Sequence, residues 1–239
     1  MGITTRTFDY SGDGETFEGY LALPEGDARK PVVLVAHAWA GQTDMERGKA
    51  DRIAAELGYA AFAIDVYGKG KRGTTVEENQ ALMNPLVGDR AKLQRRLSAA
   101  VDTAKTLDGV DTSKRVAAGF CFGGLCVLDM ARAGMDVAGV ASFHGLFGAP
   151  DNLSGYSIDA KVIAYHGWKD PMAPPDDVIA LSKEMAAANA DWQLMAFGTA
   201  FHSFTTPGAN NPDMGTMYET AADNRSWWAF RGFLKEVLG

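Results

Sequence analysis

Short apolar runs alternate with amphipathic segments along most of the chain. The runs 32–35 and 162–165 are continuously apolar, which is typical of strands buried on both faces of a parallel sheet. The alternation of strands and helices predicts an α/β fold, a doubly wound, mostly parallel sheet with helices on both faces. The expected elements are strand 32–37, helix 44–57, strand 60–65, helix 89–107, strand 115–119, helix 122–133, strands 137–143 and 161–166, helix 175–188, strand 192–197 and a final helix near 214–237.

The N-terminal segment has a different pattern. Two alternating runs, Thr5–Tyr10 and Thr16–Leu23, flank the Gly-Asp-Gly sequence at 12–14, which predicts a short antiparallel hairpin. Further along, Gly58 and Gly134 each follow a helical pattern, as expected of glycines that end helices in the left-handed conformation.

The composition fits one globular domain. Hydrophobic residues make up 46% of the 239 residues and charged residues 22%, which is enough for a sizeable core. No repeat and no Pro/Gly/Ser-rich linker divides the chain, so we expect a single α/β domain over residues 1–239. The net charge of −7 argues against nucleic-acid binding, which requires a basic surface to displace counterions from phosphates.

Nothing in the chain indicates export or a membrane. Met1–Gly12 is polar and lacks the charged leader and apolar core of a secretory signal, and the longest apolar stretches fall far short of the ~20 residues that span a bilayer. The two cysteines, Cys121 and Cys126, are too few for a disulfide framework and poorly spaced for zinc or a Cys-x-x-Cys pair. We therefore expect a cytoplasmic protein without a metal site.

All four histidines fall at or just after the expected carboxyl ends of strands. They are His37, His144, His166 and His202. Ligands bind at this edge of an open parallel sheet. A single histidine there is more often structural than catalytic, so the clustering marks the functional face and leaves the role of each histidine open.

The segment Gly119–Gly124, Gly-Phe-Cys-Phe-Gly-Gly, lies between an expected strand and an expected helix. This is the strand–turn–helix context of a nucleophile elbow, with Cys121 in the place of serine. The amide of Phe122 would then donate to an oxyanion, and the helix N-terminus would favour the thiolate. The alternative is a core cysteine at a glycine-rich turn; Cys126, on the apolar face of the helix, is expected to be such a residue.

A thiol nucleophile requires a base, and the base requires an acid that orients it. In hydrolases with this elbow the acid and then the histidine follow the nucleophile along the chain. Asp170 follows the strand 161–166 and His202 follows the strand 192–197, so order and placement predict a Cys121–Asp170–His202 triad. Asp170 could alternatively be a turn residue before a proline.

Together these motifs resemble the dienelactone hydrolase family of α/β-hydrolases over nearly the whole chain. The family's Gly-x-Cys-x-Gly-Gly elbow matches Gly119–Gly124, its strand-end acid matches Asp170, its His-Ser-Phe segment matches His202–Phe204, and its Asp-Leu-Tyr turn is similar to Asp65–Gly68. The resemblance implies a cytoplasmic hydrolase of small-molecule esters or lactones that uses no cofactor, binds no membrane and is a monomer or a weak homo-oligomer.

The chain departs from this family at two positions that bear on the substrate. Members that open dienelactones carry a glutamate where this chain has Ala38, and that glutamate holds the resting thiol in check. Glu46 lies too far along the chain to replace it. We therefore expect Cys121 to pair directly with His202 at rest. They also carry an arginine where this chain has Thr206, so a substrate carboxylate would lose about 1.5–3 kcal/mol of binding. Nearby cations, expected to be solvated surface charges, are Lys69, Lys71, Arg72 and Arg90.

Aromatic side chains flank several expected strand ends and indicate a pocket for a neutral or apolar acyl or aryl substrate. The expected pocket residues are His37, Phe143, His144, Trp168, Phe201 and Phe204. The loop that carries Trp39 should supply the second oxyanion amide.

The sequence thus predicts cleavage of small ester or lactone bonds through a thioester on Cys121. Three alternatives stay open: a thioesterase or peptidase on the same triad, a non-catalytic ligand-binding relative of the fold, and a thiol redox protein. The last requires a resolving cysteine, for which Cys126 is badly placed.

Overall fold

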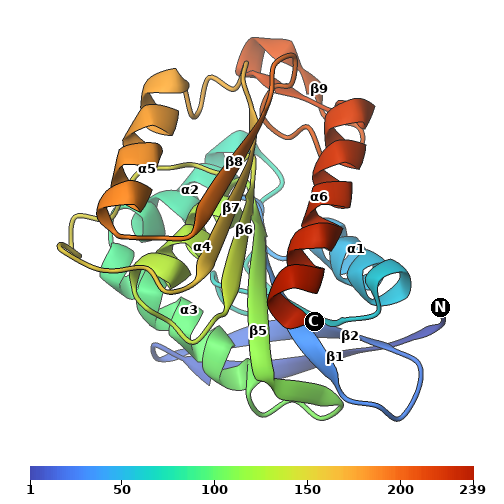
Figure 1. The fold of residues 1–239 in the computed structure, drawn as a ribbon. Helices are drawn as coiled ribbons and strands as arrows, with labels where there is room; N and C mark the ends of the chain where they lie inside the picture. The colour runs from blue at the N-terminus through green and yellow to red at the C-terminus, as the bar shows by residue number, and fades with distance from the viewer.

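An eight-stranded sheet runs through the computed structural model, which describes residues 1–239 (Figure 1). The strand order is β1-β2-β4-β3-β5-β6-β7-β8; β1–β2 and β2–β4 are antiparallel and all other neighbours are parallel. The elements are β1 (Ile3–Gly12), β2 (Glu15–Pro24), β3 (Lys30–Ala36), α1 (Asp44–Arg52), β4 (Ala60–Ile64), α2 (Val76–Val87), α3 (Arg90–Ala104), β5 (Val110–Phe120), α4 (Phe122–Arg132), β6 (Gly139–Phe143), β7 (Lys161–Gly167), α5 (Pro175–Ala187), β8 (Trp192–Phe197), β9 (Asn210–Asn211), β10 (Thr216–Met217) and α6 (Thr220–Leu238).

Hydrophobic side chains pack against both faces of the sheet. One core lies between the sheet and helices α2, α3, α4 and α5, and the other lies between the sheet and helices α1 and α6 (Figure 1). In β3, Val32 and Leu34 belong to the first core whereas Val33 and Val35 belong to the second. Successive residues of a strand point to opposite faces, so a strand covered on both sides must be apolar throughout. The predicted doubly wound architecture is confirmed.

The predicted hairpin and helix ends are also confirmed. β1 and β2 are joined by Asp13 and Gly14, both with positive φ (50° and 74°), which suits a tight two-residue turn. Gly58 and Gly134 have φ of 76° and 62°, in the left-handed region, directly after helical segments. No helix combines the length and the apolarity needed to cross a bilayer.

Several segments differ from the sequence-based expectation. Helix α2 was not predicted, because Pro85 interrupts its pattern and much of its surface is solvent-exposed. The final helix begins at Thr220 and not near 214, because residues 210–217 form the small hairpin β9–β10 around a 3₁₀ turn, Pro212–Met214. In addition, α1 continues only as a π-helical turn, Ile53–Leu57.

Candidate active site

Cys121 lies in the turn between β5 and α4 and is 9% exposed. Its φ of 56° and ψ of −116° are sterically unfavourable for a residue with a side chain. The turn is possible only with glycine on either side: a Cβ on Gly119 would lie 1.9 Å from the Gly123 carbonyl oxygen, and a Cβ on Gly123 would lie 2.2 Å from the Ala36 carbonyl oxygen. Strand β5, helix α4 and the neighbouring strand β3 therefore meet closely and place the thiol at the carboxyl end of the sheet.

Two main-chain amides are available near the thiol. Phe122 is the first residue of α4, so its amide has no carbonyl of a preceding helical turn to bond. The amide of Trp39, in the loop after β3, donates no hydrogen bond. Since β3 and β5 are adjacent, with Ala36 paired to Gly119, both amides belong to the same corner of the site as Cys121.

The loop after β3 is held by His37, which does not line the cavity described below. His37 Nδ1 donates to the Ala38 carbonyl oxygen (2.7 Å), and its Nε2 accepts from the Val66 amide (3.2 Å). The Tyr67 hydroxyl donates to the Trp39 carbonyl oxygen (2.9 Å). His37 is fully buried and joins the ends of β3 and β4, so it is structural, and the prediction that it lines the pocket is wrong.

Asp170 and His202 are brought together from two loops. The Asp170 Oδ2 atom lies 2.7 Å from His202 Nδ1, and Asp170 Oδ1 accepts the Met172 amide at 2.8 Å. The main chain of His202 donates to the Gly215 carbonyl oxygen and accepts from the Met217 amide, both at 2.9 Å. The β9–β10 hairpin thereby fixes the backbone of His202, and the carboxylate fixes its ring, which leaves Nε2 as the atom free for chemistry.

The electrostatics of His202 connect it with Cys121. Burial lowers the pKa of His202, but the negative charge of a Cys121 thiolate and the hydrogen bond with Asp170 outweigh it and raise the pKa to about 10. His202 Nε2 is buried and has no partner that meets hydrogen-bond geometry, so it stays available to Cys121, which lines the same cavity. The structure thus brings the three predicted triad residues to one place.

Cys121 and His202 both line a cavity of about 500 Å³. Much of its wall is flexible and apolar, with the side chains of Met45, Met83, Met172 and Met214. Glu46 is the only carboxylate in the wall, and no lysine or arginine lines it.

Comparison with known proteins identifies the family. A profile described as the Dienelactone hydrolase family matches residues 17–238. The chain belongs to the dienelactone hydrolase family. It is a hydrolase of this type, as the resemblance of its motifs implied.

Three proteins illustrate the relationship. An uncharacterized protein of Caenorhabditis elegans, K02A2.1, is 39% identical over 157 residues, which cover 64% of this chain and 99% of that protein. A solved structure named m3DLH is 33% identical with a TM-score of 0.94, and a dienelactone hydrolase-like promiscuous phosphotriesterase, P91, from metagenomic libraries is 32% identical with a TM-score of 0.93. Both structures cover 100% of this chain and of their own.

In this dienelactone hydrolase family member, only one of the predicted pocket side chains lines the cavity, namely His144. Phe143 and Phe204 are buried in the core on the α6 side of the sheet. Phe143 is the last residue of β6, and its ring packs against Phe230 of α6, whereas His144 follows the strand with a φ of 38° and lines the cavity. Phe201 lies under Lys169, whose Nζ is 5.6 Å from the ring centroid, outside the cavity.

Trp168 also lies outside the cavity and is 45% exposed. The prediction that Phe143, Trp168, Phe201 and Phe204 line the pocket is therefore wrong. The cavity wall instead includes Gln80, Met83 and Asn84 of the unpredicted helix α2. A sequence signal for this helix exists in the capping box of Thr75 and Glu78, Thr-x-x-Glu, which marks a helix N-terminus.

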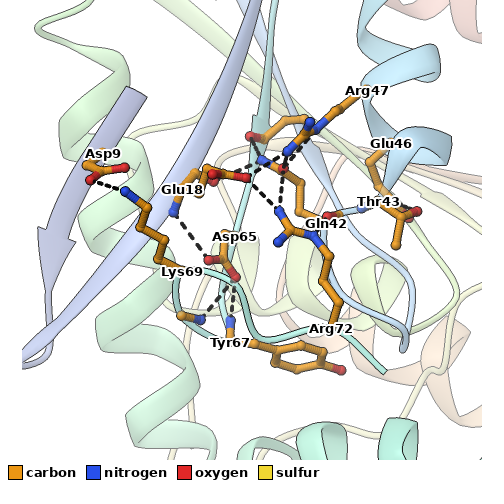
Figure 2. Close-up of polar contacts among 12 residues, drawn as sticks. Asp9, Glu18, Gln42, Thr43, Glu46, Arg47, Asp65, Tyr67, Lys69 and Arg72 are labelled. Carbon is orange, nitrogen blue, oxygen red and sulfur yellow. Dashed lines mark hydrogen bonds and ion pairs between the residues drawn. The ribbon is translucent and has the colours of Figure 1, made fainter. Parts of the chain in front are cut away.

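The four cationic side chains noted in the sequence pair with carboxylates outside the cavity. Figure 2 shows Lys69 paired with Asp9 (2.6 Å) and Arg72 paired with Glu18 (2.7 Å). Lys71 pairs with Glu15 at 3.0 Å. Arg90 was expected to be a solvated charge; it is instead buried against Asp129. None of the four lines the cavity.

Proposed function

We propose that this hydrolase cleaves small ester or lactone bonds with Cys121 as nucleophile, His202 as base and Asp170 as the residue that orients His202. The observation that carries the proposal is the 2.7 Å contact between Asp170 and His202 Nδ1, which leaves the unpartnered Nε2 in the same cavity as Cys121. This geometry meets the requirements of a nucleophile, a base and an orienting acid.

The reaction begins with attack of the Cys121 thiolate on the carbonyl carbon, while the amides of Phe122 and Trp39 bind the oxyanion. The tetrahedral intermediate collapses to a thioester as the imidazolium of His202 gives its proton to the leaving alkoxide. With the thiolate charge gone, the main cause that raises the pKa of His202 is also gone. The neutral imidazole then deprotonates a water molecule, which hydrolyses the thioester, releases the acid and restores the thiolate–imidazolium pair.

The cavity favours a neutral substrate with an apolar acyl or aryl group. Its methionine side chains adapt to differently shaped ligands, and its only charged group apart from the proposed catalytic residues is the Glu46 carboxylate. A carboxylated lactone would find no cation in the wall and would be repelled by Glu46. Neutral esters and lactones are therefore the proposed substrates.

A second candidate activity is the hydrolysis of neutral aryl phosphotriesters. The 32% identical phosphotriesterase with a TM-score of 0.93 supports it, as does a cavity wall without lysine or arginine. The thiolate would attack phosphorus and expel the aryl oxide, which His202 protonates.

Intact-protein mass spectrometry tests both candidates. The protein is mixed with p-nitrophenyl esters of increasing acyl bulk, and each reaction is stopped with acid within seconds. We expect Cys121 to gain the mass of one acyl group. If the second activity exists, an aryl dialkyl phosphate should add one dialkylphosphoryl group. A Cys126→Ala variant should carry the same adduct, because Cys126 is buried away from the cavity. Turnover with no adduct from any ester, or an adduct on Cys126, would contradict the proposed nucleophile.

Alkylation of Cys121 should depend only weakly on pH. In the proposed resting state the Cys121 thiolate and the Asp170 carboxylate raise the pKa of His202, so its ring stays protonated from pH ~6.5 up to about 10 and releases the proton above that range. We expect the rate of iodoacetamide alkylation, followed by mass, to change less than about threefold between pH 6.5 and 8.5. An ordinary thiol, with its pKa near 8.5, would react about 50-fold faster at the upper pH, and that result would refute the resting ion pair.

A further inference from the structure

Helix α1 lies between the loop that carries Trp39 and the loop that carries His202, and two buried charged residues of the helix bond one loop each. Glu46 and Lys49 are one turn apart and have no part in the mechanism above. We propose that both are positioning residues: Glu46 holds the loop that presents the Trp39 amide, and Lys49 holds the segment that follows His202. This proposal rests on the proposed function.

Both carboxylate oxygens of Glu46 bond the loop that carries Trp39. Oε2 accepts the Thr43 amide (2.9 Å) and the Thr43 hydroxyl (2.7 Å), which forms the capping box of α1. Oε1 accepts the Ala38 amide at 3.0 Å, a contact that a capping box does not require. One side chain therefore joins both ends of the segment from Ala38 to Thr43. Trp39 lies inside this segment, so the direction of its amide depends on Glu46.

Lys49 reaches the loop on the other side of the helix. Its Nζ donates to the Thr205 carbonyl oxygen (2.9 Å) and lies 5.2 Å from the ring centroid of Phe120. The Thr205 hydroxyl in turn lies 2.9 Å from Nε2 of His144, whose ring is 5.1 Å from that of His202. Burial lowers the pKa of Lys49, because the ammonium group loses solvation there.

The opposite side of α1 is anchored, so the helix can serve as a fixed support. Arg47 donates to Glu18 (2.7 Å) and to the side-chain oxygen of Gln42 (3.2 Å), and Arg72 donates to the same Glu18 oxygen (Figure 2). Figure 2 shows that these contacts connect α1 with β2 and with the loop after β4. Displacement of α1 would therefore break the Arg47–Glu18 ion pair and the hydrogen bond from Arg47 to Gln42.

The two halves of the proposal have different signatures. Ester turnover requires the oxyanion amides, whereas alkylation by iodoacetamide is a displacement at carbon that forms no oxyanion. A change in the Trp39 loop should therefore lower turnover and leave alkylation unchanged. A change in the His202 segment should alter both, since the imidazolium stabilises the thiolate that reacts in each case.

The Glu46→Gln variant tests the first half, because an amide cannot accept at both positions. We expect kcat for a p-nitrophenyl ester to fall by about 10- to 100-fold, short of the ~10²–10³ of a lost oxyanion donor, with KM and the alkylation rate of Cys121 little changed. Asp44→Asn is the matched control: it removes the same charge from the same helix at an exposed position and should leave kcat unchanged. A folded Glu46→Gln variant with wild-type kcat would overturn this half.

The variants Lys49→Met and Lys49→Gln test the second half. Methionine keeps the length of the side chain without its donor, so we expect both kcat and the alkylation rate at pH 6.5 to fall by at least about fivefold. Glutamine retains an N–H donor for Thr205 and should recover part of both losses. Wild-type rates in Lys49→Met, or no recovery in a folded Lys49→Gln, would overturn the role of the Lys49 hydrogen bond. An inactive wild-type chain without acyl-enzyme would instead refute the proposed function and this proposal with it.

Discussion

The Cys121→Ala variant is expected to lose ester turnover by about 10⁴- to 10⁶-fold in kcat, the range seen when a hydrolase triad loses its nucleophile. The methyl group cannot attack a carbonyl, and the residual rate would come only from binding and from the oxyanion amides. The side chain is small and partly exposed to the cavity, so stability should change little. Steady-state kinetics with p-nitrophenyl esters, at enzyme concentrations high enough to detect the residual rate, would measure the loss.

The second cysteine provides the matched control for this prediction. Cys126 lies in α4, the helix that follows Cys121, is buried in the core on the α2–α5 side and does not line the cavity. Cys126→Ala should therefore retain kcat within a few-fold. Undiminished turnover by Cys121→Ala would rule out a mechanism with Cys121 as nucleophile. Equal losses of kcat in both variants would point to a structural effect on α4.

The largest effect on stability is expected for Asp129→Ala. Asp129 is fully buried in α4; it accepts from Arg90 at 2.7 and 2.5 Å and from Arg132 at 3.2 Å. Removal of the carboxylate would leave the Arg90 guanidinium buried without a carboxylate partner, since only the Gly148 carbonyl oxygen would still bond it. We expect a loss of about 3–5 kcal/mol, which corresponds to a fall in Tm of about 6–20 °C for a chain of this size. Thermal unfolding followed by circular dichroism would measure it.

Two variants show whether burial is the cause. Asp129→Asn keeps the shape and one acceptor, so its loss should be smaller than that of the alanine variant. Asp102→Ala breaks the exposed Asp102–Lys105 pair (2.8 Å) and should cost no more than about 1 kcal/mol. Similar Tm changes for Asp102→Ala and Asp129→Ala would contradict the argument from burial.

The parts of the fold that were predicted correctly depend on contacts close in sequence. The two-residue turn at Asp13 and Gly14 requires residues that tolerate positive φ, and the buried part of β3, residues 32–36, is apolar throughout because both of its faces are covered. The elbow around Cys121 is similar, since Gly119 and Gly123 are demanded by backbone atoms less than 3 Å away. Such requirements can be recognised from a few residues that are neighbours in the sequence.

The sequence-based predictions were wrong where the orientation of a side chain depends on elements that are distant in the sequence. Phe143 and His144 are neighbours in sequence, yet the first packs under α6 and the second lines the cavity. Arg90 looked like a surface charge because its partner, Asp129, lies on another helix 39 positions away. Helix α2 contributes Gln80, Met83 and Asn84 to the cavity wall, although its mixed pattern resembled a loop.

The sequence by itself determined the family, the alternation of strands and helices, and the candidate nucleophile, acid and histidine in their chain order, because each of these is written in local motifs. Only the tertiary structure decided which side chains line the cavity, that no lysine or arginine does so, and that Glu46 and Lys49 of α1 bond the loops on either side of the helix. The physical reason is that these properties belong to contacts between segments far apart in the chain, and a pattern of neighbouring residues carries no information on which segments meet.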